Sequence, residues 1–359
     1  MIKDQLQEGI SSLEGSSPNL LVVGDIILDE YLIGSPERIS REAPVLILEH
    51  RDSFYRLGGA ANAALNAISL GAKVCLIGLV GKDRAGEQLS KVAQEKGIVL
   101  KAVTGENQRH TTLKTRVLAN NLNLSAQSDS LTSSQQVLRL DRLSRQPLSK
   151  TEIDQLIQLV GSELKQADLV LLSDYALGVL DKQIIDYIIQ NHPRVIVDPS
   201  ADLSRFKGAY LITPNQPDTE KALGLMLDFD SEANLNELFE KLTGALGSKT
   251  ACLITRGPDG MALWDQDNFI LIPAFNRAEV FDVNGAGDTV SACISVACAS
   301  GLPLKTATLL GNLAASIVIR KAGAATTDLK EMSKALENLK SEDLDMRRIQ
   351  LKENTHSYH

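Results

Sequence analysis

The sequence predicts an α/β protein with a mostly parallel sheet and helices on both faces of that sheet. Two observations support this fold class. Short runs rich in Val, Ile and Leu alternate with segments of helical periodicity over most of the 359 residues, and the short runs are almost continuously apolar. Parallel strands buried on both faces have this character. The expected strands are Leu20–Leu28, Val74–Gly81, Leu169–Ser173, Val195–Asp198, Tyr210–Thr213 and Ala251–Thr255.

The expected helices repeat apolar residues three or four positions apart, as a single buried helical face requires. Gly301 directly follows one of these segments, where glycine commonly ends a helix because it adopts a left-handed conformation without strain. The expected helices are Ala60–Leu70, Ala85–Lys96, Glu152–Lys165, Lys182–Gln190, Asn234–Leu246, Thr289–Ala299 and Lys305–Ile319.

Two stretches interrupt this alternation and predict a small β-flap, or lid, attached to the large domain. Residues 31–57 and 111–142 contain short alternating or apolar runs without helical periodicity. Residues 120–134, between the last two runs, are mostly Asn, Ser, Gln, Asp and Thr. Such a segment buries too little apolar area to offset its ordering entropy, so we expect a mobile insertion at a hairpin tip.

The two ends of the chain lie outside the large domain, which we expect over residues 19–340. Residues 1–18 are predicted to be a polar N-terminal extension, because they contain no long apolar run. Residues 341–359 are charged and predict a polar tail, in which Asp343–Leu351 has the pattern of a short helix.

Composition restricts the classes of partner and the compartment. Lys and Arg total 37 against 45 Asp and Glu, a formal net charge of −8 without a basic stripe, which argues against nucleic acid as a partner. No apolar run approaches the roughly 18 residues that span a bilayer, and no signal peptide is recognisable. We therefore expect a cytoplasmic protein without a membrane partner. Four cysteines in apolar stretches are expected to be reduced core residues: Cys75, Cys252, Cys293 and Cys298.

The stretch Asp282–Thr289 (DVNGAGDT) is the strongest candidate for a site. Gly285 and Gly287 allow a tight turn that opens a helix, and the unpaired N–H groups of a helix N-terminus attract anions such as a phosphoryl group. Asp288 would be repelled by bound phosphate unless it accepts a proton from an attacking hydroxyl. The alternative is that Asp288 is an N-cap and the glycines are ordinary turn residues.

A second glycine-bearing stretch precedes an alanine-rich helix. Gly58 and Gly59 lead into that helix, and Asn62 lies in its first turn, where its amide can both donate to and accept from a sugar hydroxyl. The alternative is a tightly packed helix in which Asn62 is a surface or capping residue.

Polar residues also follow predicted strands, where open α/β sheets commonly bind ligands. Asp25 and Asp29 follow the first strand, and Thr255-Arg256-Gly257 ends a late one. Each is weak by itself, since strand-end Asp and Gly are often turn residues. The P-loop pattern G-x-x-x-x-G-K-[ST] and the dinucleotide pattern G-x-G-x-x-G are both missing, which argues against those two classes.

Taken together, Gly58-Gly59-x-x-Asn62 and Asp282-x-x-Gly285-Ala286-Gly287-Asp288 resemble the two signatures of the PfkB/ribokinase family of sugar kinases. The resemblance runs from about Leu20 to about Ala335 and implies a ribokinase-like fold with a lid. It also implies an enzyme that transfers the γ-phosphate of ATP to a sugar hydroxyl, with Mg²⁺ and, in many members, K⁺.

The resemblance implies a role for each matching residue. Asp288 would be the catalytic base, and the anion hole would comprise Gly285, Ala286 and Gly287. The sugar would contact Asp25, Asp29, Gly58, Gly59, Asn62, Arg116 and Asp174. ATP would contact Asn215, Thr255, Arg256, Gly257, Gly260 and Asn312, and Mg²⁺ would be held through water by Asn215 and Asp218. Carbonyls near Asp282, Asn284 and Gly323 would hold K⁺.

Within the family, the chain is most similar to the kinases that phosphorylate O1 of D-glycero-β-D-manno-heptose 7-phosphate, a step in ADP-heptose synthesis for lipopolysaccharide. The stretches that carry this similarity are Val22-Val23-Gly24-Asp25, Arg38-Ile39-Ser40, Glu42-Ala43-Pro44-Val45, Ser173-Asp174-Tyr175-Ala176 and Leu211-Ile212-Thr213-Pro214-Asn215. No H-x-G-H motif is present, so we expect the kinase without the nucleotidyltransferase to which it is often fused.

The chain departs from those kinases at Leu177 and Ser200, where they carry lysines suited to the 7-phosphate. Either an arginine of the lid compensates, Arg38, Arg116 or Arg139, or the substrate is another sugar. A third alternative is a non-catalytic sensor of sugar or nucleotide on the same scaffold. The resemblance also implies a homodimer formed through the lid strands.

Overall fold

The computed structural model describes residues 2–106, 109–120, 134–200, 202–265, 268–275, 282–340 and 344–350. Its main body is a ten-stranded sheet in the order β14-β13-β12-β11-β10-β9-β8-β1-β4-β5. Seven neighbouring strands are parallel, and the remaining three add antiparallel at one edge, so the mostly parallel sheet is confirmed. The parallel strands are β1 (Asn19–Gly24), β4 (Lys73–Val80), β5 (Val99–Thr104), β8 (Leu169–Ser173), β9 (Val195–Asp198), β10 (Leu211–Ile212) and β11 (Ala251–Thr255).

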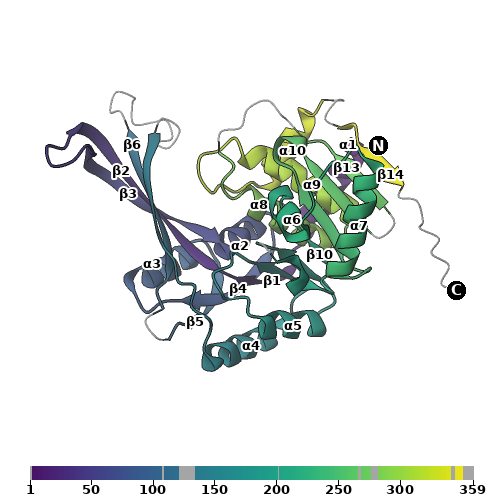
Figure 1. Cartoon of the computed structure of the whole chain (residues 1–359), viewed down its shortest axis with the longest axis horizontal. Coiled ribbons are helices and arrows are strands. Elements are labelled where there is room, and N and C mark those ends of the chain that lie inside the picture. The colour runs from purple at the N-terminus through teal and green to yellow at the C-terminus, as the bar shows by residue number, and fades with distance from the viewer. Residues whose placement is uncertain are drawn as a thin grey trace.

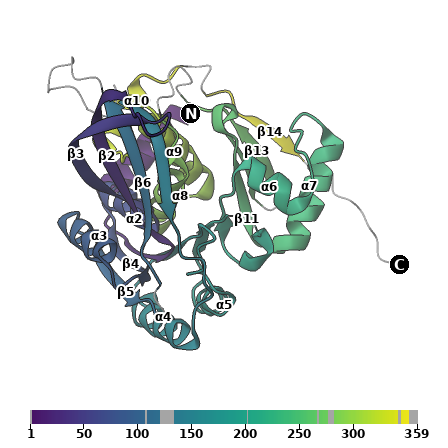
Figure 2. The same cartoon turned by 60° about the vertical axis from the view of Figure 1, so that its left-hand side comes forward.

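Helices cover both faces of this sheet, as predicted, and each layer encloses its own apolar core (Figures 1 and 2). One layer comprises α1 (Ile2–Glu14), α2 (Ala60–Ser69), α3 (Arg84–Glu95), α8 (Ala286–Ala299), α9 (Leu304–Val318) and α10 (Leu329–Glu337). The other comprises α4 (Lys150–Leu164), α5 (Lys182–Asn191), α6 (Gln216–Leu223) and α7 (Glu232–Leu246). None of the described helices is long and apolar enough to cross a bilayer.

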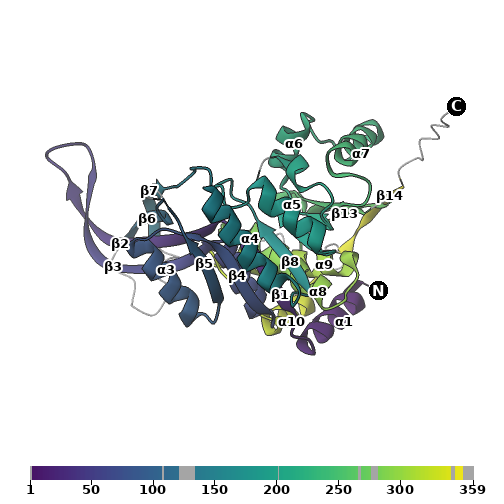
Figure 3. The same ribbon diagram turned by 90° about the horizontal axis from the view of Figure 1, so that it is seen from below.

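The lid is a separate four-stranded sheet in the order β3-β2-β6-β7. Its strands are β2 (Ile26–Ile39), β3 (Leu46–Gly59), β6 (Thr112–Asn120) and β7 (Ser134–Arg142). The β2–β3 hairpin projects far from the main body, as Figures 1 and 3 show. The predicted insertion at 120–134 falls almost entirely on residues 121–133, outside the described residues; its two ends pair with each other as Asn120 and Ser134.

The expected strand Leu20–Leu28 is in fact two strands in different sheets. β1 ends at Gly24, the chain turns at Asp25, and β2 begins at Ile26. At Gly24 an added Cβ would lie 2.0 Å from the Ser173 carbonyl oxygen, so the chain passes very close to the end of β8. Ile26, Ile27 and Leu28 continue the apolar composition after Gly24 and Asp25, so the two strands were predicted as one although these two residues form the turn.

The prediction for the N-terminal residues was wrong in one respect, because residues 2–14 form helix α1. Leu6, Ile10 and Leu13 recur on one face of α1 and are buried against the α9 and α10 layer. The overall composition of residues 1–18 is polar, and an average over the segment does not detect a narrow apolar stripe on one face of a helix.

The expected short helix near the C-terminus was also wrong. Residues Arg347–Gln350 form β14, which pairs antiparallel with the edge strand β13 (Asn268–Ile272). The neighbouring strand β12 (Met261–Asp265) and β13 itself were not among the predicted strands. An unpaired edge supplies hydrogen-bond partners that favour an extended segment over a short isolated helix.

Candidate active site

The two glycine-bearing stretches, more than 200 residues apart in sequence, meet where α2 packs against α8. The Asn62 side-chain amide donates to Oδ2 of Asp288 at 2.7 Å. Gly285 has φ +78°, and a Cβ there would lie 2.7 Å from Nδ2 of Asn62. Glycine is therefore required at position 285 both by the backbone conformation and by the contact between the two stretches.

Asp288 is a buried carboxylate that faces a second donor. The Tyr175 hydroxyl donates to its Oδ1 at 2.8 Å, while Asn62 donates to the other oxygen. Burial raises the pKa of Asp288 to about 6, and the two hydrogen bonds oppose that increase by stabilising the charged form. A carboxylate with this pKa is ionised at neutral pH and is also a stronger base than an exposed aspartate.

A cavity of about 140 Å³ opens onto Asp288, and we call it the catalytic cavity. Lid residues and main-body residues line it together, so the cavity lies between the lid and the body. The predicted sugar-site residues in its wall are Asp29, Gly58, Gly59, Asn62 and Arg116. At Gly58 an added Cβ would lie 2.5 Å from Oδ2 of Asp29, so this glycine makes room for that carboxylate.

A second cavity, of about 350 Å³, lies on the other side of the same turn, and we call it the apolar cavity. Of the residues predicted to contact ATP, it is lined by Thr255, Gly257, Gly260 and Asn312. Ala286 and Gly287 line this cavity, whereas Gly285 and Asp288 line the catalytic cavity. The N-terminus of α8 thus separates two cavities and contributes to both.

The predicted anion hole is only partly open. The Ala286 amide donates to the Val283 carbonyl at 3.2 Å, which was not expected. Within the described residues, the structure gives no hydrogen-bond partner to the amides of Gly285 and Gly287. The turn before α8 uses the Ala286 amide in a backbone hydrogen bond. The amides of Gly285 and Gly287, on either side of Ala286, remain available to an anion.

Three cations of the lid line the catalytic cavity: Lys114, Arg116 and Arg139. Arg116 pairs with Asp29 and Arg139 pairs with Asp141 through two 2.8 Å bonds. Lys114 lies over the Tyr175 ring at 5.2 Å, and burial lowers its pKa. Arg38, the third arginine expected to compensate, is not part of the lining.

Two predicted sugar-site carboxylates do not reach this cavity. Asp25 accepts three backbone amides, those of Tyr175, Leu177 and Val179, at 2.8 to 3.1 Å. Asp174 accepts from Arg205 at 2.9 Å and from the Ala176 amide. Both are buried, hold the loop that carries Tyr175 and do not line the catalytic cavity.

The remaining nucleotide-site predictions have a different placement from the one expected. Arg256 stacks on the Phe229 ring at 4.0 Å and does not line the apolar cavity. Asn215 caps α6 and donates to Asp218 at 2.7 Å, and neither residue lines either cavity. The cation-site residue Asp282 accepts the amides of Asn284 and Gly323, which joins the α8 turn to the 320–326 loop.

Three residues near the site were not predicted from the sequence: Tyr175, Lys114 and Asp198. Asp198 ends β9, and its Oδ2 lies 3.4 Å from the Ser291 hydroxyl of α8. Burial raises the pKa of Asp198 to about 8, and the nearby charge of Asp288 adds to that effect. For Asp198 the only signal was its place at the end of a strand. Tyr175 lies in the stretch Ser173-Asp174-Tyr175-Ala176, in which only Asp174 was given a site role, and nothing in the local pattern distinguishes Lys114 from its neighbours.

The carboxylates near the start of α8 bear on the question of whether a divalent cation could bind there. Asp198 and Asp288 are both destabilised as anions, and the charge of Asp218 adds to the effect on Asp198. Magnesium prefers oxygen ligands and would offset such repulsion between carboxylates. Within the described residues, no group of three or more Asp, Glu, His or Cys side chains could hold a metal ion by itself, so an ion bound here would also need ligands from water or from a bound phosphate.

A buried carboxylate at a helix N-terminus, flanked by two cavities on an α/β fold with a lid, is the arrangement of a phosphotransferase that acts on an alcohol. Comparison of the sequence with known protein families identifies its family. The model of the family described as "pfkB family carbohydrate kinase" matches residues 17–332 of the chain. The chain belongs to this family and is a carbohydrate kinase, an enzyme whose family uses ATP and a divalent metal.

Curated relatives and solved structures agree with this assignment. "Bifunctional protein HldE" of Desulfatibacillum aliphaticivorans is 37% identical over 328 residues, which are 90% of this chain and 64% of that protein. The Helicobacter pylori protein of the same name is 36% identical, covering 92% of this chain and 69% of the relative. The chain therefore spans about two-thirds of the length of these relatives.

The fold is shared with more distant kinases. Phosphofructokinase-2 from Escherichia coli in complex with potassium superposes with a TM-score of 0.70 at 18% identity, covering 90% of this chain and 99% of that one. Arabidopsis thaliana ribokinase complexed with ribose and ATP gives 0.64 at 18% identity, with the same coverage. The ribokinase-like fold with a lid is thus confirmed.

Proposed function

We propose that this kinase transfers the γ-phosphate of ATP to O1 of D-glycero-β-D-manno-heptose 7-phosphate. The single observation that supports phosphoryl transfer at this place is the N-terminus of α8, which lies between the catalytic and apolar cavities. A sugar in the first cavity and ATP in the second would face each other across the open amides of Gly285 and Gly287.

Asp288 is the base of this proposal. A sugar hydroxyl that points at the carboxylate loses its proton to Asp288 as its oxygen bonds to the γ-phosphorus, and the bond from that phosphorus to the bridging oxygen of ADP breaks. Asn62 and Tyr175 hold both carboxylate oxygens in place, which fixes the direction of proton transfer. The two glycine amides stabilise the negative charge on the moving phosphoryl group.

The three lid cations support a phosphorylated acceptor. Leu177, which replaces an expected lysine, is buried, so the body contributes no cation at that position. Lys114, Arg116 and Arg139 line the wall instead and place positive charge opposite the catalytic carboxylate. A phosphate ester on the sugar would pair with Lys114 and Arg139, because the Arg116–Asp29 pair is buried whereas the Arg139–Asp141 pair is partly exposed and can exchange its carboxylate for the phosphate.

Magnesium and potassium complete the proposed site. Asn215 and Asp218 would hold Mg²⁺ through water, with Asp198 as a further carboxylate on the same side. The metal would neutralise charge on the phosphates of ATP. The chain segments joined by Asp282 and Gly323 would hold K⁺ next to the anion hole.

We also propose a homodimer formed through the lid. Its support is a set of large apolar side chains that are exposed on the lid: Ile39, Val45, Leu46, Val137, Leu138 and Leu140. Exposed apolar surface on projecting strands is typical of an interface between subunits. Sedimentation at micromolar concentration should give a dimer, and a monomer would contradict this part of the proposal.

A panel of acceptors tests the proposed substrate. ADP release is measured with heptose 7-phosphate, fructose phosphates, ribose and nucleosides at equal concentration, and heptose 7-phosphate should give the highest kcat/KM. A higher value for another sugar would show that the burial of Leu177 and the change at Ser200 mark a different acceptor. Binding of ligand without any ADP release would favour a sensor over an enzyme.

A further inference from the structure

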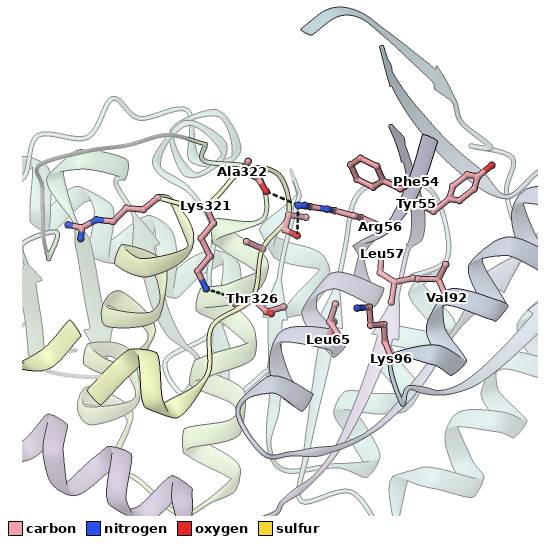
Figure 4. A pocket seen from close by; sticks show the side chains of 13 residues that line it. Phe54, Tyr55, Arg56, Leu57, Leu65, Val92, Lys96, Lys321, Ala322 and Thr326 are labelled. Atoms are coloured by element: carbon pink, nitrogen blue, oxygen red, sulfur yellow. Dashed lines mark hydrogen bonds between the residues drawn. The ribbon is translucent and has the colours of Figure 1, made fainter. Parts of the chain in front are cut away.

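A third cavity in the described part of the chain is separate from the two that adjoin α8. It has a volume of about 740 Å³ and lies between β3, helices α2 and α3, and the loop at residues 320–326 (Figure 4). We call it the basic groove. It shares Ala324 with the catalytic cavity but opens on the other side of Arg56.

The charge of the basic groove is opposite to that of the whole chain. Its lining contains four basic residues and no carboxylate: Arg56, Lys96, Arg320 and Lys321. The formal net charge of the chain is −8. A local cluster of cations in an acidic protein creates a positive potential at one place, which attracts an anion there.

The basic side chains of the groove differ in how strongly neighbouring groups fix them in position and offset their charge. Arg56 donates to the carbonyl oxygens of Ala322 at 2.7 Å and Ala324 at 3.4 Å, so backbone dipoles fix it, and no carboxylate in the described part of the chain forms an ion pair with it. Lys321 pairs with Glu331 at 2.6 Å, which offsets its charge. Lys96 is exposed at the end of α3 and turns its ammonium group toward the 320–326 loop, as Figure 4 shows.

The rest of the wall is apolar and aromatic. Leu57, Leu65 and Val92 form an apolar surface next to the cations, and Phe54 and Tyr55 add two rings at one end. The Arg56 guanidinium lies 5.6 Å from the centre of the Phe54 ring. Phe54 stacks on Tyr31 and the Tyr55 hydroxyl donates to Glu30, so the positions of both rings are fixed. A wall with this mixture suits a molecule that has both an anionic group and a ring.

We propose that the basic groove binds an organic phosphate of mononucleotide size, at a site separate from the sugar and from ATP. Arginine and lysine together recognise a phosphate group, and the adjoining apolar wall packs against the ring of the ligand. The volume lies within the range of small-molecule sites. Because Ala324 belongs to both walls, the occupant lies directly behind the turn that carries Gly285.

Calorimetric titration with three probes tests this proposal: inorganic phosphate, pyrophosphate and cytidine monophosphate. We expect cytidine monophosphate to bind more tightly than inorganic phosphate, because only the nucleotide reaches the apolar wall. In Lys96→Glu the dissociation constants of pyrophosphate and the nucleotide should rise at least tenfold, as expected for the loss of a charge-assisted contact and its replacement by repulsion.

Lys91→Glu is the matched control, since Lys91 is exposed on the same helix and is not part of the groove lining. Its dissociation constants should equal those of the unchanged protein. Without probe, both variants should release ADP at the original rate, which separates this site from the proposed catalytic one. The proposal is overturned if no probe binds, if inorganic phosphate binds as tightly as the nucleotide, or if Lys96→Glu leaves binding unchanged and alters only the oligomeric state.

Discussion

The helix α8 and the lid sheet approach the same cavity in contrasting ways. Eleven consecutive residues of α8, from Asp288 to Cys298, are buried, and the catalytic carboxylate is held by two side chains of the main body. Strand β7 is almost entirely exposed, and it contributes Arg139 from a surface open to solvent. In the proposed function, this contrast means that the body provides a preorganised base, whereas the lid provides charge that recognises the acceptor. Changes in the body should therefore affect kcat, and changes in the lid should affect KM.

The largest effect is expected from Asp288→Asn. The amide cannot accept the hydroxyl proton, so kcat should fall by roughly 10²–10⁴, the range for a positioned base. The measurement is steady-state ADP release, with thermal melting as the control for folding. A kcat close to that of the unchanged enzyme would remove Asp288 from the mechanism and with it the contrast between body and lid.

The next effect concerns the lid cations. Lys114→Gln combined with Arg139→Gln should raise KM for a phosphorylated acceptor by roughly 10- to 100-fold, because each charge-assisted hydrogen bond contributes about 1.5–3 kcal/mol and part is recovered by water. The value of kcat at saturation should change little. Arg38→Gln, on the same sheet but outside the cavity, is the control and should leave KM unchanged. An equal loss of kcat in the double variant would mean that the lid also takes part in the chemistry.

Tyr175→Phe should give a smaller effect that depends on pH. The pKa of Asp288 is raised to about 6, so the base is ionised above that pH and kcat/KM should fall as the pH drops through 6. Removing the tyrosine hydroxyl removes a bond that lowers this pKa, so the acid limb should shift upward by about one unit. A profile of kcat/KM from pH 5 to 9 measures the shift. An unchanged acid limb would show that another group titrates in this range.

The smallest effect on turnover is expected from Leu6→Ala in α1. This side chain is fully buried, so its truncation should lower the free energy of unfolding by about 2–5 kcal/mol. Denaturant unfolding measures the loss, and kcat and KM at 25 °C should remain unchanged because no residue of α1 lines either cavity. A solvent-exposed position on the same helix, Glu8→Ala, is the control. If kcat fell as much as stability, the N-terminal helix would belong to the catalytic body rather than only to its packing.

Much of the site was predictable because the signals were local. The glycines at 58, 285 and 287 and the aspartate at 288 lie in short patterns whose chemistry depends on backbone conformation. The strands β9 and β11 were predicted at their observed bounds. A strand that is buried on both faces is an almost continuous run of apolar residues, and such a run can be recognised without knowing which strands pair with it. By contrast, the bend at Asp25 and the edge strand β14 depend on contacts with segments that are distant in sequence. A short stretch of sequence contains no information about such contacts.

The order of residues was enough to predict the class of fold, an anion-binding turn and a candidate proton acceptor, because each follows from periodicity or from short-range backbone geometry. Folding alone decided which polar groups line the catalytic cavity. Asp25 and Asp174 were turned toward backbone amides and Arg205, while Tyr175 and Lys114 were brought to Asp288 and its cavity. The physical reason is that a buried polar group takes whichever partner the packing places within reach, and that partner can be far away along the chain.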